Sequence, residues 1–305
     1  MAISAKDVME LRKQTDCGMM ECKKALTEAG GDFAKAVELL RERGLATAAK
    51  KAGRIAAEGM VYADYCPQCK VGVVIEVNAE TDFVAKNDKF VAFKDAAKVI
   101  MEQNPADVDA LMNCKMGEGT VDDGLKQLIL VIKENIKVRR FVRYEGACAA
   151  YVHGGGTHAV LVDFETSDEI AAKPEFAAYG KDIAMQIAAA NPSYVDEANV
   201  PAEVVAKEKE IMLAQMAGDP KTANKPEAVK AKMVEGKIKK FFKENCLVEQ
   251  EFVKDGDLTV GQYTAKVAKE LGGDIKIVKF ARFQKGEGLE KRADDFASEV
   301  ASMVK

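Results

Sequence analysis

The sequence predicts an α+β fold, in which a small helical module precedes two related halves that each combine strands with helices. Three observations favour this fold. The residues up to Gly44 show helical periodicity only, a pattern of strands and helices occurs twice further along the chain, and the second copy contains a charged insertion. A chain of 305 residues is long enough for two or three domains of about 100–200 residues each.

Residues 1–54 predict a bundle of three short helices around one small core, similar to a ubiquitin-associated-type bundle. The helices are expected over 4–13, 19–29 and 33–43. Asp32 precedes the third helix, and its carboxylate can accept hydrogen bonds from the free amides of the first turn. We expect Gly44 to end that helix and a short helical connector to follow over 46–57.

Met19 and Met20 lie beside the turn at Gly18. Two methionines at such a turn form either an adaptable apolar contact for a partner or part of the bundle core. Their spacing leaves both interpretations open.

A strand at 72–77 recurs at 159–164, an offset of 87 residues (159 − 72). The same offset carries Asn104-Pro105 onto Asn191-Pro192. In both copies a strand hairpin leads to a helix that ends at the Asn-Pro pair, because a residue before proline disfavours the helical conformation. The middle of the chain is therefore predicted to be an internal repeat.

The second copy is longer than the first. Residues 133–135 match residues 243–245 at an offset of 110 (243 − 133), so 23 residues (110 − 87) are extra. They fall within about 197–235, a strongly charged segment that is interrupted at 218–220. This pattern predicts a projecting helical hairpin, or coiled coil, with a merely solvated surface helix as the alternative.

The two halves of the core are predicted to cover 55–146 and 147–283, with the repeated part of the second half finishing near Phe252. A C-terminal module is expected over 284–305. A helix, a strand and an amphipathic helix are expected over 259–271, 275–283 and 294–304.

Composition limits the possible functions. Lys and Arg number 45 against 49 Asp and Glu, a net charge of −4, so the chain lacks the basic excess of a nucleic-acid-binding protein. The basic run 137–141 is interpreted as a sheet face, with RNA contact as the alternative. No signal segment is visible, and the apolar stretches are too short to span a bilayer. We expect a cytoplasmic protein that binds neither membrane nor nucleic acid.

Seven scattered cysteines indicate reduced thiols rather than a disulfide framework. Cys66 and Cys69 have the spacing of a redox or zinc motif. A thioredoxin-type site needs a helix after its first cysteine, but a strand follows here, and zinc needs a second ligand pair that the sequence lacks. A tight hairpin turn is favoured, and we expect no metal and no other cofactor.

The sequence contains no phosphate-binding glycine loop and no serine nucleophile motif. The glycines that follow His153 are interpreted as turn residues, because the serine motif that accompanies an oxyanion loop is absent. With two histidines in the chain, we expect neither direct nucleotide binding nor covalent catalysis.

The polar segment 78–87 follows the strand at 72–77 and precedes a helix that begins near Asn87. Phe83 lies within it. An aromatic side chain at this place either packs against the following helix or inserts into the groove of a partner. Composition and spacing do not decide between the two.

Motifs distributed along nearly the whole chain carry a family resemblance. They lie at 11–12, 18–20, 22–27, 48–52, 81–86, 202–205, 233–236, 286–288 and 295–297. Their sequences and order resemble the elongation factor Ts family, the nucleotide exchange factors of elongation factor Tu in bacteria and organelles. The resemblance implies a ubiquitin-associated-like N-terminal domain, a two-part core, a coiled-coil protrusion and a C-terminal module.

The resemblance also implies a function. A member of this family binds the GDP form of elongation factor Tu, disrupts its magnesium and phosphate site, and promotes the exchange of GDP for GTP. The implied magnesium-displacing loop consists of Thr81, Asp82, Phe83 and Val84. Asp82 and Phe83 are the residues expected to insert between helices of the partner's GTPase domain. Further implied partner contacts are Arg12, Met19, Met20, His153, Phe296 and Val300.

By the same resemblance, the protein is not an enzyme, needs no cofactor, and contacts the GTPase domain and the C-terminal part of elongation factor Tu. The coiled coil mediates dimerisation in some members, so a homodimer or a heterotetramer with the partner is possible. The family often carries glycine where Lys133 stands in this sequence.

Overall fold

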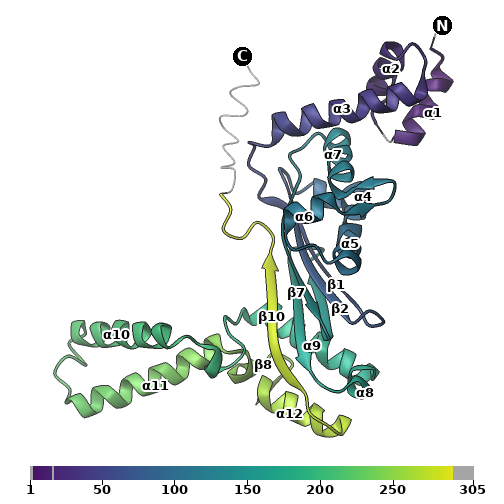
Figure 1. Ribbon diagram of the computed structural model, residues 1–305. Helices are drawn as coiled ribbons and strands as arrows, with labels where there is room; N and C mark the ends of the chain where they lie inside the picture. Colours follow the sequence, from purple (N-terminus) through teal and green to yellow (C-terminus); the bar gives the residue numbers. More distant parts are fainter. Residues whose placement is uncertain (1–2, 16, 291–305) are drawn as a thin grey trace.

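The computed structural model describes residues 3–15 and 17–290. Figure 1 shows a helical bundle at one end of the molecule, a core of strands and helices, and a pair of helices, α10 (Ala202–Gly218) and α11 (Glu227–Asn245), that projects from the core. This combination of helices and sheets confirms the predicted α+β class.

The N-terminal bundle consists of α1 (Ala5–Thr15), α2 (Met19–Glu28) and α3 (Phe33–Lys51). One leucine from each helix is buried in its core; these are Leu11, Leu26 and Leu40. Asp32 caps α3 as predicted, because its carboxylate accepts a hydrogen bond of 3.1 Å from the backbone N–H of Lys35.

The prediction that Gly44 ends the third helix is wrong. The helix α3 continues to Lys51 and includes the first half of the expected connector, and the chain then turns into the first strand. A Cβ atom at Gly44 would stand 3.4 Å from the backbone oxygen of Lys126 in α7 (Val121–Ile132). The glycine therefore lets two helices approach closely instead of ending one.

The bundle is fastened to α7. Leu130 of α7 belongs to the apolar cluster of the bundle, and the Nη2 atom of Arg41 lies 2.8 Å from Oδ1 of Asp123. The hydrogen bonds that Asp123 accepts from Arg41 and Thr120 lower its pKa to about 2. The bundle is thus joined to the core by both apolar and polar contacts.

The described chain forms two antiparallel sheets of three strands with the same plan. The first has the order β1-β2-β5 and the second the order β6-β7-β10, so that in each sheet a third strand pairs with the second strand of a hairpin. The strands are β1 (Glu58–Cys66), β2 (Val71–Ala79), β5 (Lys137–Glu145), β6 (Ala147–His153), β7 (His158–Glu165) and β10 (Lys276–Gln284). The predicted repeat is confirmed.

The repeated part of the second half does not finish near Phe252, because β10 supplies its third strand. Phe252 belongs instead to a small ladder formed by β8 (Glu251–Phe252) and β9 (Asp255–Thr259). The helix predicted over 259–271 is observed as α12 (Val260–Leu271), with Thr259 as its N-cap. The chain thus completes the second sheet only after that helix.

Helices and short strands connect the sheet strands. Those of the first half are α4 (Asp88–Ala92), α5 (Ala96–Gln103), α6 (Val108–Asn113), β3 (Lys115–Met116) and β4 (Gly119–Thr120). Those of the second half include α8 (Asp168–Ala171) and α9 (Pro174–Ala190). Asn104 ends α5 and Asn191 ends α9, both in the left-handed conformation, as the two Asn-Pro pairs predict.

The two sheets pack face to face. Side chains such as Val74 of β2 and Leu161 of β7 form the apolar layer between them. On the outer faces, α5 and α7 cover the first sheet, and α9 and α12 cover the second. The middle strand β2 is therefore buried at every one of its positions. At Gly72 a Cβ atom would stand 2.5 Å from Cδ1 of Leu161, so glycine permits the close approach of the sheets.

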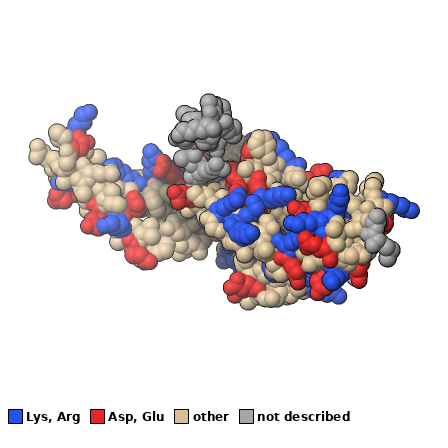
Figure 2. All heavy atoms as spheres, turned by 90° about the horizontal axis from the view of Figure 1, so that it is seen from above, with Lys and Arg blue, Asp and Glu red and all other residues tan. Residues whose placement is uncertain are grey.

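The predicted insertion is a helical hairpin, but it does not end at 235 as expected. It consists of α10 (Ala202–Gly218) and α11 (Glu227–Asn245), which extend away from the sheets in Figure 1. Met216, Val234 and Ile238 form a small apolar cluster between the two helices. Figure 2 shows acidic and basic side chains intermingled along the hairpin, as expected for a solvated projection.

None of the helices among the described residues is both long enough and apolar enough to cross a bilayer.

Candidate functional site

The candidate site is the loop that follows β2. Because β2 is buried along its whole length, it holds the start of this loop in a fixed position. Glu80 and Thr81 are half-buried, and Asp82 and Phe83 are exposed. The chain then forms a short 3-10 helix at Val84–Lys86 and enters α4, whose N-cap Asn87 accepts a hydrogen bond from the N–H of Lys89.

Two carboxylates clamp the loop to the turn between α7 and β5. The backbone N–H of Thr81 donates to Oε2 of Glu134 at 2.9 Å, and its hydroxyl donates to Oε1 at 2.7 Å. In the opposite direction, the backbone N–H of Asn135 donates to Oε1 of Glu80 at 2.6 Å. These bonds cross between the two segments, so neither segment can move without breaking charge-assisted hydrogen bonds.

The turn that carries this clamp is itself held in place. The side-chain amide of the buried Asn135 donates to the carbonyl of Arg54 at 2.7 Å. Lys133 ends α7 in the left-handed conformation with φ of +64°. This conformation favours glycine, so Lys133 occupies a backbone position that glycine would adopt with less strain.

Phe83 and Val84 have opposite environments. Val84 is buried in the core cluster of the first half, whereas the side chain of Phe83 is 77% exposed. Val84, and not Phe83, therefore anchors the segment that leads into α4, and the alternative in which Phe83 packs against that helix is wrong. Large aromatic side chains are rarely left in water on a rigid loop unless they meet a partner.

The N-terminal bundle presents a second apolar surface. Met19 is 43% exposed and Met20 is 72% exposed, so neither fills the core of the bundle. Arg12 and Met19 line a shallow hollow together with Lys6, Met9, Glu10 and Lys13. The structure thus brings two of the predicted contact residues together and adds Met9, which the spacing of the sequence did not single out.

His153 lies at the end of β6, where the turn to β7 begins. Its Nδ1 atom is 3.0 Å from the hydroxyl of Tyr151, and its side chain is exposed. The carbonyl of Gly156 in this turn accepts a hydrogen bond of 2.9 Å from the N–H of Val61 in β1. The turn therefore packs near the start of β1, which is paired with the end of β2 from which the candidate loop emerges.

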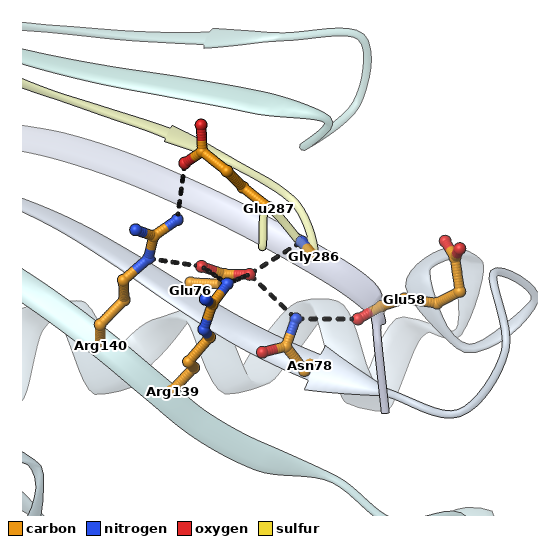
Figure 3. Close-up of polar contacts among 7 residues, drawn as sticks. All are labelled: Glu58, Glu76, Asn78, Arg139, Arg140, Gly286 and Glu287. Atoms are coloured by element: carbon orange, nitrogen blue, oxygen red, sulfur yellow. Dashed lines mark hydrogen bonds and ion pairs between the residues drawn. The ribbon is translucent and has the colours of Figure 1, made fainter. Parts of the chain in front are cut away.

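Phe296 and Val300, and the helix expected around them, lie outside the described residues. The segment that leads towards them is held by a buried carboxylate. Figure 3 shows Glu76 of β2, which is 0% exposed, in contact with Arg139 and Arg140 of β5. Its Oε1 atom also accepts a hydrogen bond of 2.9 Å from the N–H of Gly286, beyond β10.

Several groups neutralise this buried charge. Burial raises the pKa of Glu76, but hydrogen bonds from Asn78, Gly286 and Arg140 outweigh burial and leave the pKa below its usual value. Arg140 also bonds to Glu287 at 3.2 Å. The basic run 137–141 thus uses Arg139 and Arg140 to pair with carboxylates of the chain itself, in agreement with its interpretation as part of a sheet.

The Cys66–Cys69 pair occupies the turn between β1 and β2, as predicted. The structure joins the two residues by a disulfide bond, so the expectation that all cysteines are reduced is wrong for this pair. In the part of the chain that the structure describes, no three His, Cys, Asp or Glu side chains gather as a metal site would require.

The fold and the candidate loop together combine a fixed backbone with an exposed aromatic side chain. A model of the family described as "Elongation factor TS" matches residues 80–287. Elongation factor Ts of Symbiobacterium thermophilum is 50% identical over 304 residues, covering 98% of this chain and 97% of its own length. Those of Clostridium perfringens and Syntrophotalea carbinolica are both 48% identical, with at least 99% of each chain covered. The chain belongs to the elongation factor Ts family.

Proposed function

We propose that this chain is a nucleotide exchange factor that binds the GDP form of elongation factor Tu and promotes the exchange of GDP for GTP. The observation that carries the proposal is the exposed Phe83 on a loop whose neighbours are fixed. Membership of the elongation factor Ts family supplies the partner.

In the proposed mechanism, Asp82 and Phe83 enter the GTPase domain of the partner between two of its helices. Thr81 and Val84 keep the loop in shape, the first through Glu134 and the second through the core. A packed partner can accommodate an aromatic ring only by moving its helices. A shift of about 1 Å would disturb both the octahedral magnesium ligands and the amides that bind the phosphates, which are strict in their geometry.

Binding of this chain and binding of GDP must oppose each other equally. If the chain weakens the affinity of elongation factor Tu for GDP, GDP weakens the affinity for this chain by the same factor. The mechanism requires no covalent step, no cofactor and no nucleotide bound to this chain. It therefore assigns no catalytic residue.

The other contacts extend this interaction. Arg12, Met19 and Met20 of the bundle contact the GTPase domain in this proposal, as do Phe296 and Val300. His153 contacts the remainder of the partner.

The corresponding division of the chain is a bundle at 1–54, core halves at 55–146 and 147–283, and a C-terminal module at 284–305. A mass measurement of the complex would distinguish a complex with one copy of each protein from a heterotetramer.

The proposal is tested by the release of fluorescent GDP from elongation factor Tu. Phe83→Ala should slow the release about tenfold or more, because truncation of a central aromatic anchor typically costs about 2 kcal/mol or more. Val253→Ala is the matched control, since Val253 is also a strongly exposed apolar residue but lies in the β8–β9 turn. An unchanged rate with Phe83→Ala would exclude the mechanism in which Phe83 moves the partner's helices apart.

A further inference from the structure

The disulfide between Cys66 and Cys69 lies at an accessible place. It spans the turn between β1 and β2, with Cα atoms 5.4 Å apart. Cys66 is half-buried and Cys69 is exposed, as are Pro67 and Gln68 between them. A thiolate from solution can therefore approach the bond from the side of Cys69.

The hairpin does not depend on this bond. Every residue of β1 is paired with a residue of β2, up to Cys66 opposite Val71. The turn is also held from outside, because the carbonyl of Lys70 accepts a hydrogen bond of 2.8 Å from the N–H of Gly146 and the Lys70 ammonium lies 2.7 Å from the Asp168 carboxylate. A disulfide that closes so short a loop adds little constraint to the unfolded chain. Both redox forms should therefore keep the same fold.

The two sulfur atoms have different roles in a thiol exchange. The backbone N–H of Cys69 lies 3.2 Å from Sγ of Cys66 and donates a hydrogen bond to it. This bond stabilises negative charge on Cys66, which makes Cys66 the better leaving group. An incoming thiolate is thus directed to Sγ of Cys69, the more exposed of the two residues.

The other cysteines are poor competitors. Cys17, Cys22, Cys148 and Cys246 are buried, and Cys114 is half-buried. Burial raises the pKa of the Cys148 thiol to about 12 and that of the Cys246 thiol to about 11. Reaction with a dissolved thiol or disulfide should consequently be selective for the Cys66–Cys69 pair.

We propose that Cys66 and Cys69 form a redox modification site that cycles between disulfide and dithiol by exchange with a thiol reductant. In reduction, the thiolate of the reductant attacks Sγ of Cys69, a mixed disulfide forms, and Cys66 leaves as a thiolate that takes up a proton. A second reductant thiol attacks the mixed disulfide and releases Cys69. Two electrons and two protons pass to the protein, and the reductant is oxidised to its own disulfide. Oxidation is the reverse, with a disulfide as oxidant.

The test uses the full chain in buffers that contain reduced and oxidised glutathione at a series of fixed ratios. After acid quenching, denaturation and alkylation, mass spectrometry counts the free thiols. The count should change reversibly between seven and five, with the loss confined to the peptide that contains Cys66 and Cys69. Cys114→Ser is the control, and it should show the same loss of two thiols from a total smaller by one.

Single variants test the order of the steps. Cys66→Ser, which retains the exposed Cys69, should accumulate one glutathione per chain on Cys69. Cys69→Ser should acquire the adduct several-fold more slowly, because Cys66 is half-buried. Circular dichroism establishes that both variants remain folded. Replacing glutathione by a protein dithiol of the thioredoxin type distinguishes a small-molecule reductant from a protein reductant.

Three results would overturn the proposal. The pair would remain oxidised at every glutathione ratio if the bond were purely structural, and it would remain reduced at every ratio if the geometry of the thiols opposed closure. Zinc that copurifies in a fixed ratio and is lost in both Cys→Ser variants would indicate a shared metal site instead. None of these measurements involves GDP release, so they are independent of the proposed exchange function.

Discussion

At the scale of single residues, one carboxylate governs the candidate loop. Glu134 accepts hydrogen bonds from both the amide and the hydroxyl of Thr81, two residues before Phe83. The residue contacts no proposed partner group itself, so we regard it as a positioning residue. Its contribution should therefore be visible in the action of Phe83 as well as in stability.

We expect Glu134→Ala to lower the free energy of unfolding by about 1–3 kcal/mol, because the half-buried amide of Thr81 loses its acceptor. The same change should slow GDP release from elongation factor Tu although Phe83 is still present. Glu134→Gln, which retains an acceptor oxygen, should recover part of both effects. Urea unfolding and fluorescent GDP release provide the two measurements.

Lys133→Gly is the control for this series. It alters the neighbouring residue of the same turn but removes a strained left-handed lysine whose side chain is exposed. Stability should rise by about 0.5–1 kcal/mol, while GDP release stays unchanged. If Glu134→Ala were destabilising yet left GDP release unchanged, Glu134 would have a structural role only.

Much at this scale could be predicted from the sequence alone. Asp32 was recognisable as a helix cap, because capping depends on a residue and its immediate neighbours. The role of Glu134 was not recognisable, since its partner is 53 positions away in the chain. From the sequence, Glu134 was known only as part of the match between residues 133–135 and 243–245.

At the scale of elements, the α10–α11 hairpin has a small core of its own. Met216, Val234 and Ile238 are its buried apolar residues, and their cluster is separate from the clusters around the sheets. An element with so little buried apolar surface should open more readily than the sheets do.

We expect Ile238→Ala to weaken this hairpin by about 2–4 kcal/mol, as large-to-small changes in a core generally do. Amide hydrogen exchange should become faster across 202–245 and stay unchanged in β1 and β2. Ile211→Ala, at a more exposed position of α10, should have a much smaller effect. Equal acceleration in the sheets would show that the hairpin does not fold as a separate unit.

Sequence patterns located most elements but misjudged where some features end. Gly44 resembled a helix terminus, because the pattern does not reveal that α7 lies against it. The strand expected over 275–283 is present as β10, but the repeat was expected to finish before it, near Phe252, because the short β8–β9 ladder lies between the two. In both cases a tertiary contact decided what the local sequence left undetermined.

At the scale of the whole molecule, Glu76 links three separate parts of the chain. It lies between the sheets and bonds to β5 and to the segment that follows β10. A Cβ atom at Gly286 would stand 2.0 Å from the carbonyl oxygen of Ala57, so that segment also packs tightly against the entry to β1. These contacts therefore hold the chain in place at Gly286, near the end of the described residues.

We expect Glu76→Gln to lower the free energy of unfolding by about 3 kcal/mol at pH 7, because Arg139 and Arg140 lose a buried partner. The pKa of Glu76 is lowered on folding, so its carboxylate contributes fully above its unfolded value of 4.5 and less as the pH falls through the folded value. The difference between wild type and variant in urea unfolding should therefore shrink below pH 4.5.

Glu287→Gln is the matched control, since Glu287 also pairs with Arg140 but is exposed. Its effect should stay below about 1 kcal/mol, as is usual for surface ion pairs. If the Glu76→Gln variant were as stable as wild type, the ion pairs of Glu76 with Arg139 and Arg140 would not contribute to the free energy of unfolding.

The plan of the two sheets has a consequence for the order in which the chain folds during its synthesis. β2 meets β5 after the chain has made only α4 to α7, whereas β7 must wait for β10 until α8 to α12, including the projecting hairpin, have been made. Pairing of distant segments is slow because the intervening chain must be closed first. The completed sheet of the first half can therefore provide a surface on which β6 and β7 pack while the last strand is still being synthesised.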